Sequence, residues 1–353
     1  MGREPLMKSL VFSSLVLAAV SSVAAADRVQ LTMDASEAEA VLAILSTRAA
    51  GQAVADSAWQ KLLACEPYVR LKKRESSLRR DFGDDEFKRF VLSEDLLRGA
   101  PELQRTLDAW KTTDLRAVAE RILPYLPPDA RVRAKVYPVI KPLSNSFVSE
   151  VTSDPAIFLY LDPKQSPEDF ANTVAHESHH IGYADAGERY DERIKALPDN
   201  PRKAAEWMGA FGEGLAVLAA AGSADVHPMR DFKEADRVRW DQDIRSFDQN
   251  LAQMNQFFLD VVDGGFAKPE VADHVAFTFF GYRGPWYTVG YQMGAMVEKR
   301  YGRAVLVECM SDPRTLLARY NEVAAEQKAA GQETLPLWSP ELLAAVGIAT
   351  KAK

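Results

Sequence analysis

Two histidines one helical turn apart, with a glutamate beside the first, form the segment of this sequence that is best suited to chemistry. The segment reads His176-Glu177-Ser178-His179-His180, an HExxH pattern. Residues four apart share one face of a helix, so His176 and His180 can both reach one Zn²⁺ at about 2.0 to 2.1 Å. Glu177 stands beside the pair, where it can take a proton from a water molecule that the metal activates. The pattern predicts a zinc-dependent hydrolase. We expect His179 to have a supporting or structural role.

A catalytic zinc site usually has three protein ligands. The extended pattern that ends in a third histidine is broken, because Tyr183 stands where that pattern has glycine. A glutamate on a following helix is the other solution, and Glu213 within Phe211-Gly212-Glu213-Gly214 is the best candidate. Glu206, seven residues earlier on a similar face, is the second candidate. The glycines on both sides of Glu213 predict a close approach of its helix to the HExxH helix.

The elements that must position these residues are mostly helical. Ser166-Pro167-Glu168-Asp169 combines an N-cap residue, a proline and two acids, which predicts a helix from Pro167 to Ile181. A capping-box pattern at Ser36 predicts a helix over residues 36–49. Helical patterns also cover residues 59–63, 103–123, 201–221, 231–262, 269–280, 285–301 and 313–329.

Runs of β-branched and aromatic residues interrupt the helices in the middle of the chain. They cover residues 132–136, 139–140, 146–148 and 156–161, and they predict a small sheet just before the HExxH helix. The expected fold is α+β, predominantly α-helical with a small sheet next to that helix. We expect a helical N-terminal region over residues 27–130 and a catalytic region over residues 131–353, which together form one compact unit.

Residues 1–26 have the features of a secretory signal peptide. Arg3 and Lys8 precede an apolar run over residues 10–20, and Ala24-Ala25-Ala26 offers a cleavage site. A membrane anchor is the alternative, but it needs about 20 apolar residues. We therefore expect a mature chain that begins near Asp27, is secreted across the inner membrane to the periplasm and has no stable membrane insertion.

The net charge limits the possible partners, and the cysteine content limits the possible disulfides. Cleavage removes Arg3, Glu4 and Lys8, which takes the formal net charge from −7 to −8 and disfavours nucleic acid as a partner. The only cysteines are Cys65 and Cys309. An oxidising compartment permits a disulfide between them, and two separate thiols fit the sequence equally well.

The HExxH segment, followed about thirty residues later by Glu213-Gly-x-Ala, resembles the gluzincin metallopeptidases. More closely, the chain resembles a bacterial family of domains of unknown function described as zinc-dependent peptidases. The segments that carry this closer resemblance are Gly284-Pro285-Trp286-Tyr287-Thr288-Val289-Gly290-Tyr291, Asp312-Pro313 and Tyr320-Asn321. The resemblance implies a peptide or protein substrate and zinc ligands at His176, His180 and Glu213.

The resemblance also implies a tyrosine or histidine that stabilises the oxyanion. Tyr287 and Tyr291 share one helix face, and either fits this role, while packing beside Gly290 and Gly294 is the alternative for both. Arg283 could bind a substrate carboxylate and His274 could donate to the oxyanion, whereas His227 has no predicted role. By analogy, residues 156–161 would form an edge strand that pairs with an extended substrate.

Two other functions fit the same residues. One is a zinc-bound binding protein of the cell envelope that has no activity, because its ligands could persist after catalysis was lost. The other is a zinc hydrolase that cleaves a non-peptide amide. Peptide-library and substrate profiling distinguish both from a peptidase.

Overall fold

The computed structural model describes residues 28–78, 80, 83–281, 283–332 and 334–349. The predicted signal peptide, residues 1–26, and Asp27 lie outside the described residues. Within the described ranges, no helix combines the length and the apolar character needed to cross a membrane.

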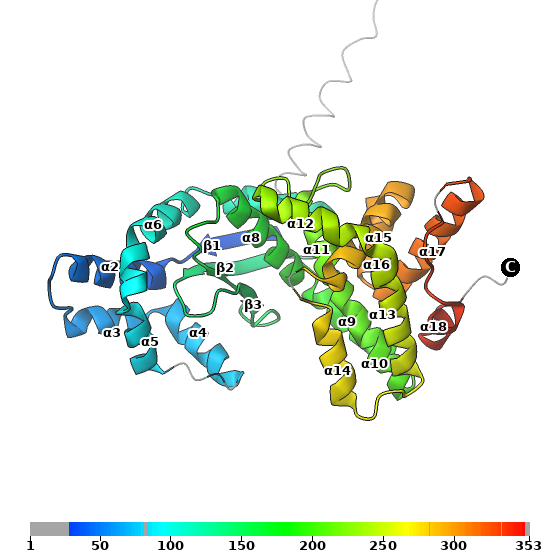
Figure 1. Ribbon diagram of the computed structural model, residues 1–353, viewed down its shortest axis with the longest axis horizontal. Helices are drawn as coiled ribbons and strands as arrows, with labels where there is room; N and C mark the ends of the chain where they lie inside the picture. The colour runs from blue at the N-terminus through cyan, green and yellow to red at the C-terminus, as the bar shows by residue number, and fades with distance from the viewer. Residues whose placement is uncertain (1–27, 79, 81–82, 282, 333, 350–353) are drawn as a thin grey trace, which may run out of the picture.

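A four-stranded mixed sheet lies between two groups of helices (Figure 1). Its strands, in spatial order, are β1 (Val29–Met33), β2 (Val132–Val139), β4 (Ala156–Tyr160) and β3 (Phe147–Ser149). β1 and β4 both run parallel to β2, and the short β3 runs antiparallel to β4. The sheet thus belongs to the predicted α+β fold, although the pairing of β1 with residues 132–136 was not expected from the sequence.

β4 is an interior strand of this sheet. Its residues 156–160 pair with residues 135–139 of β2, and its first half also pairs with β3. Four of its five side chains are buried. The expectation of an edge strand over residues 156–161 is therefore wrong, and β3 occupies that edge instead.

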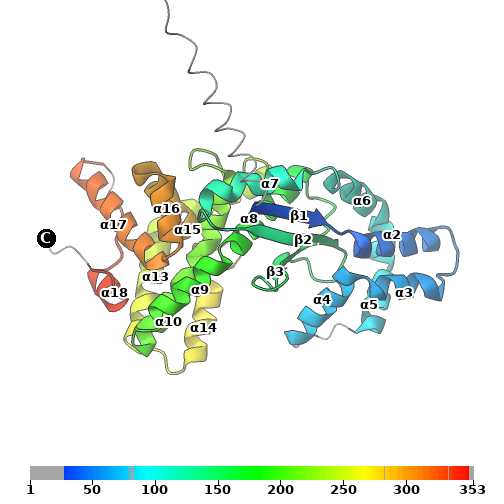
Figure 2. The same ribbon diagram turned by 180° about the vertical axis from the view of Figure 1, so that it is seen from behind.

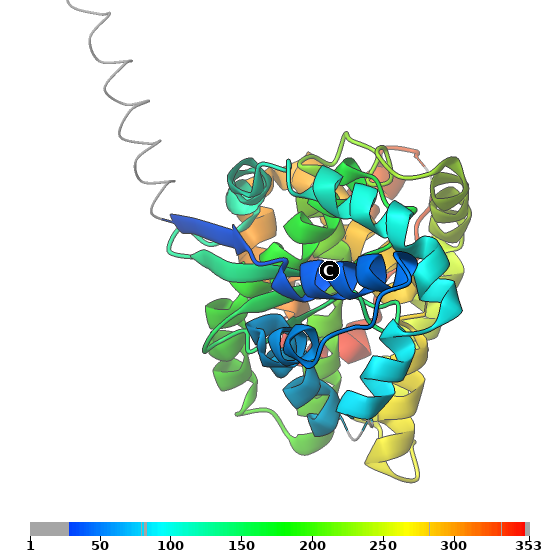
Figure 3. The same cartoon turned by 90° about the vertical axis from the view of Figure 1, so that its left-hand side faces the viewer.

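The N-terminal helices gather on one side of the sheet (Figure 1). They are α2 (Ser36–Ala49), α3 (Asp56–Ala64), α4 (Glu66–Ser77), α5 (Asp84–Val91) and α6 (Glu94–Trp110). α7 (Leu115–Ile122) instead lies over β1 and against α8, and the 3₁₀ turn η1 (Leu123–Tyr125) that follows it contacts α16. Figure 3 shows this group end-on, with β1 emerging beside it. α2 has the predicted bounds, but its N-cap residue is Ala35 and the capping box expected at Ser36 is not formed. The single pattern over residues 103–123 is divided at residues 111–114.

The C-terminal helices form the other group. They are α8 (Pro167–Gly182), α9 (Ala184–Ile194), α10 (Asp199–Met208), the 3₁₀ turn η2 (Gly209–Phe211), α11 (Gly212–Ala221), α12 (Glu234–Arg245), α13 (Phe247–Val262), α14 (Pro269–Thr278), α15 (Pro285–Tyr301), α16 (Arg303–Met310), α17 (Pro313–Ala329) and α18 (Pro340–Ala345). The single helices expected over residues 201–221 and 231–262 are each divided in two, at η2 and at Ser246. The helices over 285–301 and 313–329 are confirmed.

α8, which carries the HExxH segment, is fixed at the centre of the molecule. Its start is a capping box, in which the Asp169 amide donates to Ser166 Oγ (3.1 Å) and the Ser166 amide donates to the Asp169 carboxylate (3.4 Å). The helix contacts β2, α7 and α11, and Figure 2 shows it alongside the sheet. On its N-terminal half, the Phe170 ring stacks on Trp110 of α6 with centroids 4.4 Å apart. These contacts fix both ends of the HExxH segment relative to the core.

One apolar core joins residues from Val29 to Val346. Both cysteines are free thiols in this fold, since Cys309 is buried and Cys65 is half-buried without a bridge between them. Of the two readings that the sequence left open, the structure therefore has separate thiols.

Candidate metal centre

Three side chains from α8 and α11 converge on one point. His176 Nε2 lies 3.1 Å from Glu213 Oε2, His180 Nε2 lies 3.4 Å from the same oxygen, and the two imidazole nitrogens are 3.1 Å apart. Among the described residues, this is the group of histidine, cysteine and acidic side chains whose ligand atoms all lie close enough to hold a metal ion, within 4.8 Å of one another. The two helices bring together residues that the sequence separates widely.

The donor set fits zinc. Two neutral imidazoles and one carboxylate are ligands that Zn²⁺ takes in catalytic sites, with a fourth position left for water or substrate. A tetrahedral ion with bonds of about 2.0 to 2.1 Å separates its ligand atoms by about 3.3 Å. The three observed separations of 3.1, 3.1 and 3.4 Å lie near that value. The cluster is thus compatible with the size and geometry of the ion.

Glu206 does not join this cluster. It lies on α10, where its carboxylate is 3.9 Å from Arg202 and 3.9 Å from Lys203. Glu213 lies in the first turn of α11, after the 3₁₀ turn η2 has separated the two helices. Because of this break, the two glutamates do not share one continuous helix face. The structure therefore brings Glu213, the first of the two candidates, to the histidines.

The helix of Glu213 does contact the HExxH helix as expected, but the glycine beside Glu213 that has a packing role, Gly214, faces a different helix. A Cβ at Gly214 would overlap backbone atoms of Tyr287 and Tyr291, and one at Gly290 would lie 2.6 Å from the Phe211 carbonyl oxygen. The closest backbone approach of α11 is therefore to α15, while α11 also packs on α8 as expected. Gly212, in contrast, has open space where a Cβ would lie. The close helix contact expected at Gly290 is present, and it fixes Glu213 relative to Tyr287.

A cavity of about 280 Å³ opens beside the cluster. Its lining residues are Asn172, Thr173, His176, Glu177, Val217, Ala220, Pro228, Met229, Phe232, Gly281, Arg283 and Tyr287. Glu177 thus faces the same space as His176. Burial raises the pKa of Glu177, as does the nearby Glu213, while the two histidines oppose the change. A carboxyl group with a raised pKa is a stronger base once it is ionised.

The two candidate tyrosines occupy different places. The Tyr287 ring lies nearly parallel to His176, with centroids 6.2 Å apart, and Tyr287 lines the cavity. Burial and the neighbouring Glu213 carboxylate raise the pKa of Tyr287, which keeps its hydroxyl protonated. Tyr291 instead packs edge-on against Trp240, with centroids 5.3 Å apart, and lines a separate cavity. The geometry therefore favours Tyr287 as a hydrogen-bond donor near the cluster.

The three other candidate residues, Arg283, His274 and His227, lie in different surroundings. Arg283 lines the cavity, with its guanidinium 4.6 Å from the centre of the Phe232 ring, and its φ of 53° places it in the left-handed region. His274 is exposed on α14 and does not line this cavity. His227 contacts Asp241 at 2.9 Å and lines the cavity beside Tyr291. Of these three, only Arg283 shares the space of Glu177.

Electrostatics within the cluster follow from burial and from the Glu213 carboxylate. Burial by itself lowers the pKa of His180, but the adjacent Glu213 outweighs it and raises this pKa to about 9. Burial acts against ionisation of Glu213, yet the two histidines lower its pKa far below the usual range. Glu213 is therefore an anion, the form in which a carboxylate binds zinc.

His179 points away from these three ligand atoms. It is 2% exposed, and its ring packs on Tyr183 with centroids 4.8 Å apart. Burial lowers the pKa of His179, so it is a neutral residue within the fold. The position of His179 agrees with the supporting or structural role that the sequence suggests.

Several lining residues were not singled out from the sequence. Asn172 and Thr173 lie one turn before His176 on the same helix, so helical periodicity was a usable signal for both. Pro228, Met229 and Phe232 lie between α11 and α12. No local pattern places such a segment opposite α8, because its position depends on the packing of α11 and α12.

Comparison with known proteins agrees with the geometry. No curated protein and no solved structure matches the chain. Residues 59–329 match a family described as "Putative zinc dependent peptidase (DUF5700)", and this segment contains His176, His180, Glu213 and both tyrosines. Since the match covers most of the sequence, the chain belongs to that family.

Proposed function

We propose that this protein is a secreted zinc-dependent peptidase in which Glu177 is the general base. The observation that carries the proposal is the convergence of His176, His180 and Glu213 next to a cavity that Glu177 also lines. The description of the family supports the same activity. Secretion rests on the signal-peptide pattern of residues 1–26.

The Nε2 atoms of His176 and His180 and the carboxylate of Glu213 would hold the ion. Zinc supplies Lewis-acid activation of water and of the scissile carbonyl when it is bound. The carboxylate of Glu177 accepts the proton that the attacking water gives up and then delivers it to the leaving nitrogen. Burial beside the histidines suits Glu177 to this task, because the raised pKa makes its carboxylate a better proton acceptor.

Tyr287 donates a hydrogen bond to the oxyanion that develops during attack. Its hydroxyl stays protonated because burial and Glu213 raise its pKa. A preorganised donor of this kind stabilises developing charge at little reorganisation cost. Substrate enters through the 280 Å³ cavity, whose apolar wall includes Val217, Met229 and Phe232.

The test compares the mature protein with a Glu177→Gln variant. We expect purified protein to contain about one zinc per chain and to cleave members of a peptide library. Glu177→Gln should retain the metal, because this residue is not a ligand, and should lose peptide cleavage. Glu168→Gln is the matched control, since Glu168 is an exposed acid in the first turn of the same helix.

Each outcome separates the proposal from its rivals. Cleavage that persists in Glu177→Gln at the wild-type rate would overturn the role of this glutamate. Zinc content without cleavage of any library member would favour the inactive binding protein. Hydrolysis of amides that are not peptides, with peptides left intact, would favour a zinc hydrolase that acts on a non-peptide amide.

A further inference from the structure

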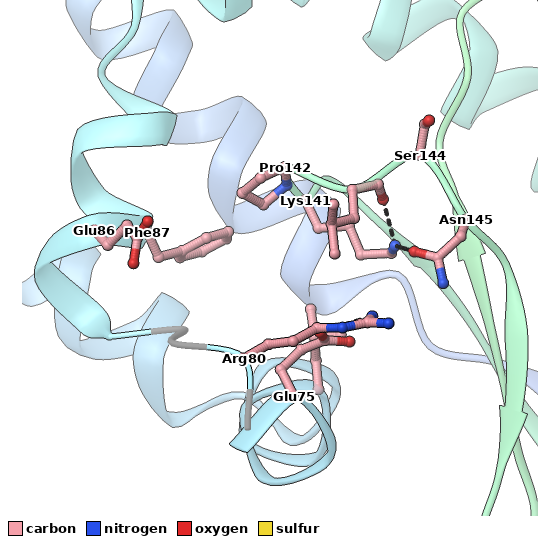
Figure 4. A pocket seen from close by; sticks show the side chains of 10 residues that line it. Glu75, Arg80, Glu86, Phe87, Lys141, Pro142, Ser144 and Asn145 are labelled. Atoms are coloured by element: carbon pink, nitrogen blue, oxygen red, sulfur yellow. Dashed lines mark hydrogen bonds and ion pairs between the residues drawn. The ribbon is translucent and has the colours of Figure 1, made fainter. Parts of the chain in front are cut away.

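A second cavity lies in the N-terminal half of the protein. Its volume is about 740 Å³, and its walls are α4, α5 and the segment after β2 (Figure 4). It shares no lining residue with the 280 Å³ cavity beside His176. Sites for small molecules commonly have volumes of about 300 to 1,000 Å³. The cavity is thus large enough for a ligand and is separate from the proposed peptidase site.

One part of this cavity is apolar. Leu71 of α4 is fully buried, and Phe87 of α5 is 1% exposed. Pro142 and Leu143 add apolar surface from the segment after β2, and Leu143 is 48% exposed. A large aliphatic side chain so exposed at a cavity wall favours contact with an apolar ligand, because that contact removes it from water.

A buried lysine lies at the other part of the wall. Lys141 is 3% exposed, and its Nζ donates to Asn145 Oδ1 (2.6 Å) and to the Leu143 carbonyl oxygen. An ammonium group has three donors, so these two acceptors do not use its full capacity. Among the described residues, no carboxylate lies within ion-pair distance of Lys141, and its favourable interactions with the charges of Glu75 and Glu37 act over a longer range. Burial lowers the pKa of Lys141 to about 8, which reflects the cost of this cation.

Among the described residues that line the cavity, acidic and basic side chains are equal in number, two of each, but they are paired unequally. Glu75, which is 3% exposed, is the buried carboxylate in the lining, and both Arg74 (2.7 Å) and Arg80 (3.4 Å) contact it. Glu86 lies across the cavity, on the exposed side of α5 (Figure 4). Behind Lys141, burial raises the pKa of Glu37 to about 8, so this carboxyl group is mostly protonated at neutral pH. Glu75 therefore has two cationic partners, whereas the buried Lys141 has no carboxylate within ion-pair distance among the described residues.

We propose that this cavity binds a small amphiphilic anion, an aliphatic or aromatic body with one carboxylate or sulfonate group. The anionic group lies by Lys141 and Arg80, and the apolar body contacts Leu71, Phe87 and Leu143. A neutral ligand would leave the buried cation without a counter-charge, which is costly in a low-dielectric site. A cationic ligand would place a second positive charge next to the buried Lys141, and repulsion between the two charges would oppose binding.

The test uses the full mature chain and 8-anilinonaphthalene-1-sulfonate, a fluorescent aromatic sulfonate. We expect saturable binding of this probe and its displacement by decanoate. Decyltrimethylammonium, which has the same chain length and the opposite charge, should displace it poorly. Equal displacement by the two ten-carbon compounds would contradict the proposed role of the cations.

Two variants assign the binding to this cavity. Leu143→Glu adds a negative charge at an exposed position, so the fold should persist while probe affinity falls at least about tenfold. Val69→Glu is the matched control, because Val69 is 49% exposed on α4 and does not line the cavity. Circular dichroism verifies that both variants are folded. Unchanged affinity in Leu143→Glu, or an equal loss in both variants, would overturn the proposal.

A third variant tests the charge itself. Lys141→Met keeps an apolar side chain of similar length and should abolish the preference for decanoate over decyltrimethylammonium. If the preference for decanoate over decyltrimethylammonium survives this change, Lys141 does not bind the anionic group. None of these measurements depends on zinc or on peptide cleavage, so the proposal stands or fails independently of the proposed peptidase activity.

Discussion

His176 Nε2 lies 3.1 Å from Glu213 Oε2, although 37 positions separate the two residues in the chain. The distance is set by two helices, α8 and α11, whose contact brings Glu213 to His176, and His176 lines the 280 Å³ cavity. A zinc ion shared by these atoms would link the two helices. Removal of either side chain therefore affects metal binding directly.

We expect Glu213→Gln to lower zinc affinity by at least about 10- to 100-fold, since even partners beyond the direct ligands have effects of that size. An amide is neutral and is a poorer zinc ligand than a carboxylate. Glu206→Gln is the control, because Glu206 contacts Arg202 and Lys203 on α10. Competition with a chelator gives both affinities. Equal losses in the two variants would contradict the assignment of Glu213.

Tyr287→Phe should lower kcat by about 10²- to 10³-fold, the usual effect of removing one oxyanion donor, with little change in KM. Tyr291→Phe should change kcat much less, because Tyr291 packs on Trp240 away from the cluster. Steady-state kinetics on one peptide substrate compares the variants. If Tyr291→Phe were the more damaging change, the roles of the two tyrosines would be exchanged.

Gly214→Ala should destabilise the protein by about 1 to 3 kcal/mol or more, because its methyl group would overlap the backbone of α15. The same substitution at Gly212 meets open space and should leave the melting temperature unchanged or slightly raised. Thermal unfolding measures both. Similar melting temperatures for the two variants would show that α11 and α15 can separate without cost.

Glu37→Gln should alter how stability depends on pH. Burial raises the pKa of Glu37 from 4.5 to about 8, so the folded state favours the protonated acid. Stability from this group is complete below pH 4.5 and is lost as pH rises to about 8. A glutamine does not ionise, so the stability advantage of the variant should grow across this window by up to about 1.4 kcal/mol per pH unit. Urea unfolding at several pH values measures it, and a constant difference would contradict the raised pKa.

The sequence predicted which residues meet in this cluster better than it predicted the surrounding architecture. His176, Glu177 and His180 were recognisable because helical periodicity alone brings i and i+4 together. The proline signal likewise gave the correct bounds of α15, whereas α2 has the expected bounds without the capping box that was predicted at Ser36. These features depend on neighbouring residues, and local physics determines them.

The errors concern contacts between segments that are distant along the chain. β1 is stabilised by pairing with β2, about a hundred residues later, so its own five residues carry a weak signal. The predicted approach of α11 to α8 is present, but the closest backbone contact, at Gly214, is with α15. The interior position of β4 also depends on β3 and β2 together. Local sequence patterns do not specify which partner such a surface meets.

The residues that surround the cluster come from two kinds of backbone. His176, Glu177, Glu213 and Tyr287 lie on helices that are packed on one another, whereas Met229, Phe232 and Arg283 lie in connecting segments. Substitutions in those connections can therefore reshape the entrance without disturbing the helices. Evolution, or an engineer who grafts loops from relatives, has a route to new substrate preferences that leaves the reactive groups in place.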